Sequence, residues 1–99
     1  MRNIFYRIRN KKTNLFYFGF IDHLVEKVCP VQNIKYSIWE PKMPKWREDN
    51  FQSYCILDTA LDRIKKILKY TTSIAPDDIV LEKCSIEKIE IVSWENLCK

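Results

Sequence analysis

The stretch NIFYRIRNKKTNLFYFGF, residues 3–20, decides the fold that this sequence predicts. Residues 3–9 alternate in character, so that Ile4, Tyr6 and Ile8 share one face of a strand. Residues 15–20 form a second apolar run. The polar loop at residues 10–14 contains two asparagines, which adopt the left-handed conformation more readily than most residues. The stretch therefore predicts a β-hairpin.

Strand alternation sorts the rings and charges of this hairpin into two faces. We expect the core face to consist of Ile4, Tyr6, Ile8, Phe16, Phe18 and Phe20. Because cations neutralise phosphates and rings stack on bases, the outer face is a candidate site for single-stranded nucleic acid. Its residues are Phe5, Arg7, Arg9, Lys11, Lys12 and Tyr17. Alternatively, Phe5 and Tyr17 form a cross-strand pair under stacked arginines and bind nothing.

Two helices and a third strand are predicted over residues 21–70. Ile21, Leu24, Val25 and Val28 recur with helical spacing, which favours a short amphipathic helix. Residues 33–39 alternate again and predict a third strand that ends at Pro41. A second helix is expected over residues 58–70.

The helix over residues 58–70 has the clearest pattern in the chain. One apolar stripe runs along it, Asp58 can cap its first turn, and Lys65, Lys66 and Lys69 gather near its end. After the turn signal at residues 76–78, residues 79–81 and 89–91 read as one long strand or as a hairpin about residues 85–88. A short helical turn is expected over residues 93–97.

These elements predict one α+β domain over residues 1–99. Its antiparallel sheet would have four to five strands, with two helices packed on one face, in the order ββαβαββ. The strand order within the sheet does not follow from the sequence.

The net charge of +4 is divided unevenly along the chain. Residues 1–47 hold ten basic and three acidic side chains, whereas residues 48–99 hold seven and ten. Such a dipolar surface suits nucleic acid, an anionic surface or an acidic protein, although an ordinary soluble surface explains it as well. No run approaches the length of a membrane span, and we expect no membrane partner.

The four cysteines, Cys29, Cys55, Cys84 and Cys98, have no paired spacing of the kind that zinc sites use. Residues 15–21 follow a basic stretch but lack the cleavage site of a signal peptide. We therefore expect a protein of the cytosol with reduced thiols.

Signatures of catalysis are missing from the sequence. His23 is the only histidine, and Gly19 is the only glycine, so neither a nucleophile–base motif nor a phosphate-binding loop is present. Asp58 and Asp62 could hold Mg²⁺ together with Asp77 or Asp78, but helix-dipole and turn chemistry explain these residues more simply. We expect no enzyme activity, no catalytic residue, no metal and no cofactor.

Residues 39–47, WEPKMPKWR, predict a stiff loop because they contain two prolines. Large apolar groups on such a loop either fold back over the core or anchor a protein partner. The candidate protein-binding residues are Trp39, Met43, Trp46 and Arg47.

Residues 6–16, YRIRNKKTNLF, resemble the opening of a group of small tailed-bacteriophage proteins, which begin with Tyr-Arg-Ile-Arg and a polar turn ending in Thr-Gly-Leu-Phe. This chain departs from that pattern at Asn14, where the glycine is usual. The resemblance implies a phage accessory protein in the bacterial cytoplasm and transfers no catalytic residue. We expect a small non-enzymatic binding protein that engages a host macromolecule, with a protein target favoured. Single-stranded nucleic-acid binding and a structural or assembly role, with a homo-oligomer, are the alternatives.

Overall fold

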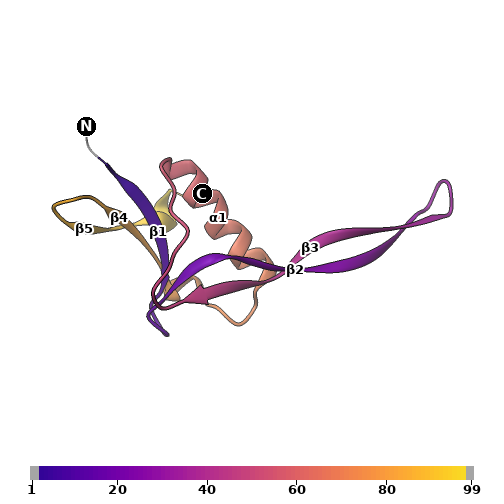
Figure 1. Cartoon of the computed structure of the whole chain (residues 1–99), viewed down its shortest axis with the longest axis horizontal. Helices are drawn as coiled ribbons and strands as arrows, with labels where there is room; N and C mark the ends of the chain where they lie inside the picture. The colour runs from indigo at the N-terminus through magenta and orange to yellow at the C-terminus, as the bar shows by residue number, and fades with distance from the viewer. Residues whose placement is uncertain (1–2, 98–99) are drawn as a thin grey trace.

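The computed structural model describes residues 3–97, so that Cys98 lies outside it. These residues form one five-stranded antiparallel sheet, one α-helix and two 3₁₀ turns (Figure 1). The strands lie side by side in the order β3-β2-β1-β4-β5. The elements are β1 (Phe5–Asn10), β2 (Leu15–Cys29), β3 (Ile34–Arg47), α1 (Leu57–Tyr70), η1 (Pro76–Asp78), β4 (Ile79–Cys84), β5 (Ile89–Val92) and η2 (Trp94–Asn96).

The α+β class and the five-stranded sheet are confirmed, but the short helix predicted from Ile21 to Val28 is wrong. Residues 21–28 continue strand β2 and pair with β3 throughout. Nor does β3 end at Pro41. It continues to Arg47, because β3 is an edge strand and tolerates residues that lack an N–H donor. The element order is therefore βββαββ.

The β1–β2 turn is shorter than predicted, and this changes which residues face the core. Asn10 pairs with Leu15, which leaves a four-residue loop in which Asn14 has a φ of 59°. The Asn10 Oδ1 atom accepts hydrogen bonds from the backbone N–H groups of Lys12 and Thr13 at 3.0 and 3.3 Å. A shift of one residue moves a strand's side chains to the opposite face.

As a result, Tyr17 and Phe16 exchange the faces that the sequence analysis gave them. Tyr17 is fully buried in the core, and Phe16 lies on the opposite face of the sheet beneath the Arg7 guanidinium. The prediction that Tyr17 is an outer-face residue is therefore wrong. The core placement of Ile8 is confirmed, and Tyr6 and Phe20 pack against the core as predicted.

Strands β1 and β2 diverge beyond their turn, and residues 51–54 occupy the space between them. Tyr54 and Tyr6 exchange two backbone hydrogen bonds of 2.7 and 2.9 Å, and the Gln52 N–H donates to the Tyr17 carbonyl at 2.9 Å. On the face away from the helix, Phe51 stacks on Phe5 with 5.6 Å between ring centroids. The sheet can therefore open without leaving these backbone groups unpaired.

Helix α1 confirms the prediction for residues 58–70 and covers the inner face of the sheet. Its N-cap is Ile56, so the predicted capping bond from Asp58 is not formed. The Trp94 indole, in the predicted C-terminal turn, donates to the buried Ile79 carbonyl at 2.8 Å. β4 and β5 form the hairpin alternative about residues 85–88. The buried core consists of Ile8, Tyr17, Tyr54, Ala60, Leu61, Ile64, Ile67, Ile79, Leu81 and Trp94.

Replacing an aromatic residue should destabilise the protein when the residue lies in the core, and hardly at all when it lies in the exposed part of β3. Tyr17→Ala should lower the free energy of unfolding by about 3 kcal/mol or more, because it leaves a cavity among buried side chains. Trp39→Ala should change it by less than about 0.5 kcal/mol, because that side chain is 70% exposed. Urea denaturation measures the free energy of unfolding of both variants. Equal losses would contradict the placement of Tyr17 in the core and of Trp39 outside it.

Candidate functional site

The most distinctive feature of the molecule is a two-stranded arm that projects from the body (Figure 1). The arm comprises residues 21–43, in which only β2 and β3 pair with each other. It extends the molecule to 57 Å along its longest axis, against 30 and 28 Å along the others. Residues 30–33 close its tip, where Asn33 has a φ of 52° and donates its N–H to the Cys29 carbonyl at 2.8 Å.

Two irregularities in the β2–β3 pairing mark the base of the arm. The register shifts between Tyr17 and Phe20 on β2, where Gly19 has a φ of 109°, and again between Ile21 and Asp22. The second shift leaves Lys42 without a cross-strand partner. Bulges of this kind bend a strand and increase its twist, so they redirect the hairpin away from the sheet.

The register assigns the side chains of the arm to two faces, because directly paired residues share a face and neighbours alternate. One face, here called the Trp39 face, carries the pairs Asp22–Pro41, Leu24–Trp39, Glu26–Ser37 and Val28–Lys35. The other, here called the Tyr36 face, carries the pairs Ile21–Met43, His23–Glu40, Val25–Ile38, Lys27–Tyr36 and Cys29–Ile34.

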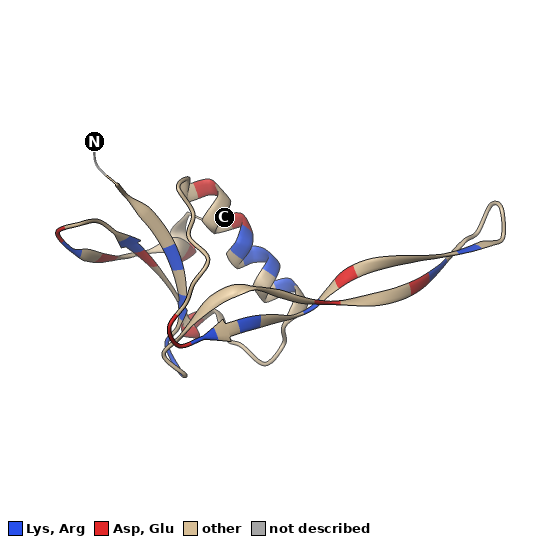
Figure 2. Ribbon diagram, in the orientation of Figure 1, with Lys and Arg blue, Asp and Glu red and all other residues tan. Residues whose placement is uncertain are grey.

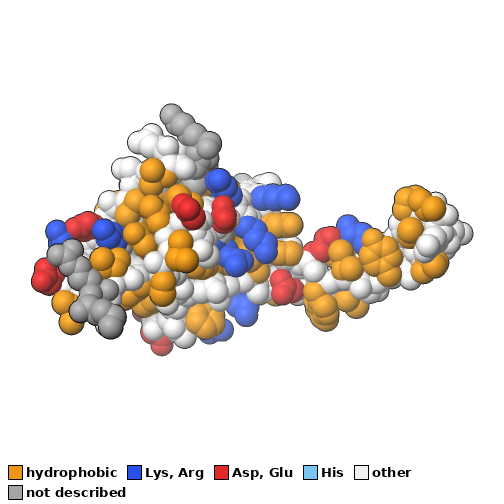
Figure 3. Space-filling model, turned by 90° about the horizontal axis from the view of Figure 1, so that it is seen from above, with side chains coloured by type: hydrophobic (Ala, Val, Ile, Leu, Met, Phe, Trp, Pro, Cys, Tyr) orange, Lys and Arg blue, Asp and Glu red, His pale blue; other side chains and the backbone are white. Residues whose placement is uncertain are grey.

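Apolar side chains are exposed on both faces of the arm. Figure 3 shows several of them along the arm from one side. Leu24 and Trp39 are 58 and 70% exposed on one face, and Tyr36 is 48% exposed on the other. Val31 at the tip is 90% exposed. Soluble monomers seldom expose contiguous apolar surface of this kind, and a hairpin alone is only marginally stable in water. The arm thus has the character of an interaction surface.

Charges on the arm balance within the arm itself (Figure 2). Residues 21–43 hold three acids and three lysines. The Lys27 ammonium lies 3.0 Å from a Glu40 carboxylate oxygen on the Tyr36 face, and the Lys35 ammonium lies 3.9 Å from Glu26 on the Trp39 face. Both pairs confirm the assignment of faces.

The four predicted protein-binding residues lie on β3 and not on a loop, which corrects the sequence analysis. Trp39 and Met43 are exposed on the arm. Trp46 packs against the core, where its ring centroid lies 6.0 Å from that of Tyr17. The Arg47 guanidinium lies 5.7 Å from the centroid of the Phe18 ring. The set is therefore divided between the arm and the body, and the expected alternative of a lid on the core applies to Trp46 alone.

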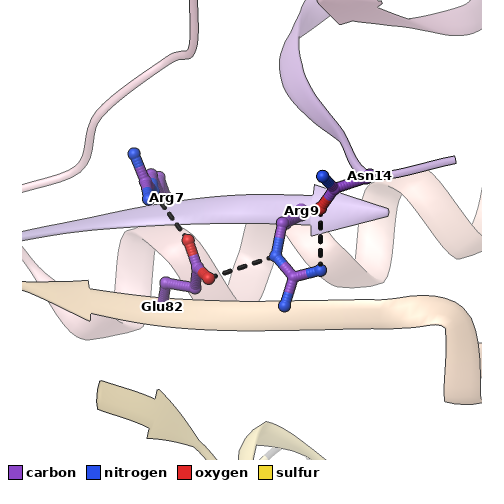
Figure 4. A network of polar contacts seen from close by, with 4 residues as sticks. All are labelled: Arg7, Arg9, Asn14 and Glu82. Carbon is purple, nitrogen blue, oxygen red and sulfur yellow. Dashed lines mark hydrogen bonds and ion pairs between the residues drawn. The ribbon is translucent and has the colours of Figure 1, made fainter. Parts of the chain in front are cut away.

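The predicted nucleic-acid-binding residues are likewise divided (Figure 4). The Nε atoms of Arg7 and Arg9 lie 2.7 and 3.1 Å from the two carboxylate oxygens of Glu82, and Arg9 also donates to Asn14 at 3.2 Å. The Arg7 guanidinium lies 4.3 Å from the Phe16 ring centroid and 5.0 Å from that of Phe51. Both arginines thus share the single negative charge of Glu82, and Arg7 is also packed against two rings.

The other residues predicted to bind nucleic acid differ in burial, so they do not lie together on one surface. Phe5 stacks on Phe51, and Tyr17 is in the core. Burial raises the pKa of the Tyr17 phenol, although the nearby charge of Arg63 acts in the opposite direction. Burial raises the pKa of Tyr54 beside it in the same way. Lys11 and Lys12 remain exposed in the β1–β2 turn. The predicted basic–aromatic surface is therefore not continuous.

Other kinds of site find little support among residues 3–97. This part of the chain brings no three His, Cys, Asp or Glu side chains together for a metal ion. A cleft of about 480 Å³ lies between residues 3–4 and the β4–β5 turn, and it contains none of the predicted site residues. Within the same residues, α1 is too short and too polar to cross a membrane.

Comparison with protein-family models, with curated proteins and with solved structures finds no match for this chain.

Sequence reasoning missed most of the arm. The sequence analysis assigns Leu24, Val25 and Val28 to a helix, and it ends the strand that begins at residue 33 at Pro41. The available signal was the apolar and β-branched content on both sides of residues 21–29, followed by a Pro30–Asn33 turn and a second such run. That pattern is typical of a hairpin of which neither face packs against the core of the protein.

The arm should be dispensable for folding, because its side chains lie outside the core. In the test variant, an Asn-Gly turn replaces residues 22–42 and connects the paired residues Ile21 and Met43. It should unfold cooperatively, with a free energy of unfolding within about 1 kcal/mol of the parent. Chemical denaturation measures this, and loss of cooperative unfolding would show that the arm is part of the folding unit.

The described cysteines should differ in reactivity. Cys84 is buried, and burial raises the pKa of its thiol despite the nearby charge of Arg7, whereas Cys55 is exposed. Since the thiolate is the reacting species, alkylation at about pH 8 should be at least tenfold slower at Cys84 than at Cys55. Mass spectrometry of the labelled peptides measures the rates, and full denaturant should remove the difference.

Proposed function

We propose that this chain is a small non-enzymatic binding protein that attaches to a protein partner through the Trp39 face of the arm. The observation that carries the proposal is the exposed Leu24–Trp39 pair within this face, on a part of β2 and β3 that no other element of residues 3–97 covers. Tryptophan is enriched among the residues that dominate binding energy at protein interfaces.

The surroundings of the pair support a protein target. Ser37 and Glu26 adjoin it toward the tip, and Asp22 adjoins it toward the base beside Pro41. An apolar centre with a polar surround is the usual anatomy of a protein interface. The resemblance of residues 6–16 to small tailed-bacteriophage proteins makes a bacterial host protein the partner class that we propose.

Positive charge lies at the base of the arm and would complement an acidic rim on the partner. Lys42, Lys45 and Arg47 follow Trp39 along β3, and none of them forms an ion pair with another residue of the described chain. Charges at the edge of an interface mainly accelerate association and set its salt dependence.

Single-stranded nucleic-acid binding is the weaker alternative. It depends on exposed cations, of which Lys11, Lys12 and the lysines of α1 are available (Figure 2). Arg7 and Arg9, however, are paired with Glu82, and the ring of Tyr17 cannot stack on a base while it is buried.

Capture from bacterial lysate, followed by titration of the captured protein, tests the proposal. Trp39→Ala should weaken binding by at least about tenfold, because it removes the central anchor. Ile86→Ala is the matched control, since Ile86 is 95% exposed in the β4–β5 turn, far along the sheet from the arm. Equal affinity of the parent and Trp39→Ala for every captured protein would reject the proposal.

A further inference from the structure

The Tyr36 face of the arm has an order of residues that the proposed partner-binding role does not explain. From base to tip, its five cross-strand pairs are apolar (Ile21–Met43), polar (His23–Glu40), apolar (Val25–Ile38), polar (Lys27–Tyr36) and apolar (Cys29–Ile34). The order reads the same in both directions. Its centre is the Val25–Ile38 pair.

The charges on this face are reversed about that centre. Glu40 lies one pair toward the base, and Lys27 lies one pair toward the tip. When two copies of the face meet antiparallel, the pair that holds Glu40 meets the pair that holds Lys27 and Tyr36 in the second copy. An ammonium and a phenol both donate hydrogen bonds to a carboxylate. The same contact is made twice, as a two-fold axis requires.

We propose that the Tyr36 face packs against the Tyr36 face of a second copy of this chain, about a two-fold axis that passes between the two Val25–Ile38 pairs. Ile21 and Met43 of each copy then pack against Cys29 and Ile34 of the other. Apolar groups meet apolar groups at the three remaining levels of the interface. Because each strand lies over its own copy, Glu40 lies opposite Tyr36 and diagonally across from Lys27 of the second chain.

The Trp39 face cannot form the same arrangement. Its four pairs have no central pair, and an axis midway along the face would set the apolar Leu24–Trp39 pair against the polar Glu26–Ser37 pair. The Leu24–Trp39 pair has Asp22 one pair toward the base and Glu26 one pair toward the tip. A two-fold axis at that pair would bring Asp22 against Glu26 of the second copy, twice. Like charges that face each other across an interface are unfavourable. This contrast selects the Tyr36 face for self-association and leaves the Trp39 face open.

The distribution of charge over the whole chain is consistent with this arrangement. The arm carries no net charge, so the +4 of the chain resides outside residues 21–43. Antiparallel arms place the two positively charged bodies at opposite ends of the assembly. With about ten side chains from each copy, the interface is smaller than that of a standard complex, so we expect a dimer that dissociates on dilution.

Sedimentation equilibrium over a concentration series tests the proposal. The parent should reach twice the mass of one chain at high concentration. Ile38→Asp should abolish the dimer, because it brings two carboxylates together at the axis. Glu40→Lys should raise the dissociation constant about tenfold or more, since it sets a lysine against Lys27 at two places. Lys35→Glu, a charge reversal on the Trp39 face, is the matched control and should leave the dissociation constant unchanged.

A mixing experiment separates the interface from the stability of the arm. Glu40→Lys and Lys27→Glu each break the ion pair within the arm, and each alone should dimerise at least about tenfold more weakly than the parent. Mixed together, they should form a heterodimer, seen by native mass spectrometry, because every contact across the axis is again between opposite charges. A monomeric parent, a heterodimer that fails to form between variants with native circular dichroism, or an equal effect of Lys35→Glu would overturn the proposal. None of these outcomes bears on Trp39-dependent capture, so the two proposals fail separately.

Discussion

The fold depends on a mismatch of length between the helix and the strands that it covers. α1 has 14 residues and spans about 21 Å, whereas β2 has 15 residues and spans about 50 Å. No other helix of this size is available in residues 3–97 to cover the remainder. The body-side part of the β2–β3 hairpin therefore contributes Tyr17, Phe20 and Trp46 to the core region, and the outer part has both of its faces in solvent.

The division of the hairpin into a buried and a free part gives the two parts different roles. Side chains near the body, such as Tyr17, contribute to stability. Side chains on the arm, such as Trp39 and Tyr36, contribute little to the core and are available to other molecules. The bulge at Gly19 and the unpaired Lys42 lie where one part becomes the other. Under the two proposals made above, the faces of the arm differ in charge pattern and carry two kinds of contact.

The sequence correctly predicts the helix and the strand that bury one face in the core, α1 and β1. The stripe of α1 and the alternation of β1 were recognised because burial on one face imposes a period on the apolar residues. Residues 21–29 were mistaken for a helix because, with neither face buried, strand alternation is lost, and Ile21, Leu24, Val25 and Val28 happen to have helical spacing. Tyr17 was misplaced because a turn one residue shorter than expected reverses the faces of the following strand. Trp39 and Met43 are exposed, as the predicted protein-binding role requires, although they lie on a strand and not on a loop.

The central claim is that the arm stands away from the body in solution. Small-angle X-ray scattering tests it most directly, at concentrations where the mass is that of one chain. A projecting arm predicts a radius of gyration near 16.3 Å and distances that extend to about 57 Å. A chain of this length with the arm folded onto its body would give a radius of gyration of about 13 Å, and that result would contradict the account.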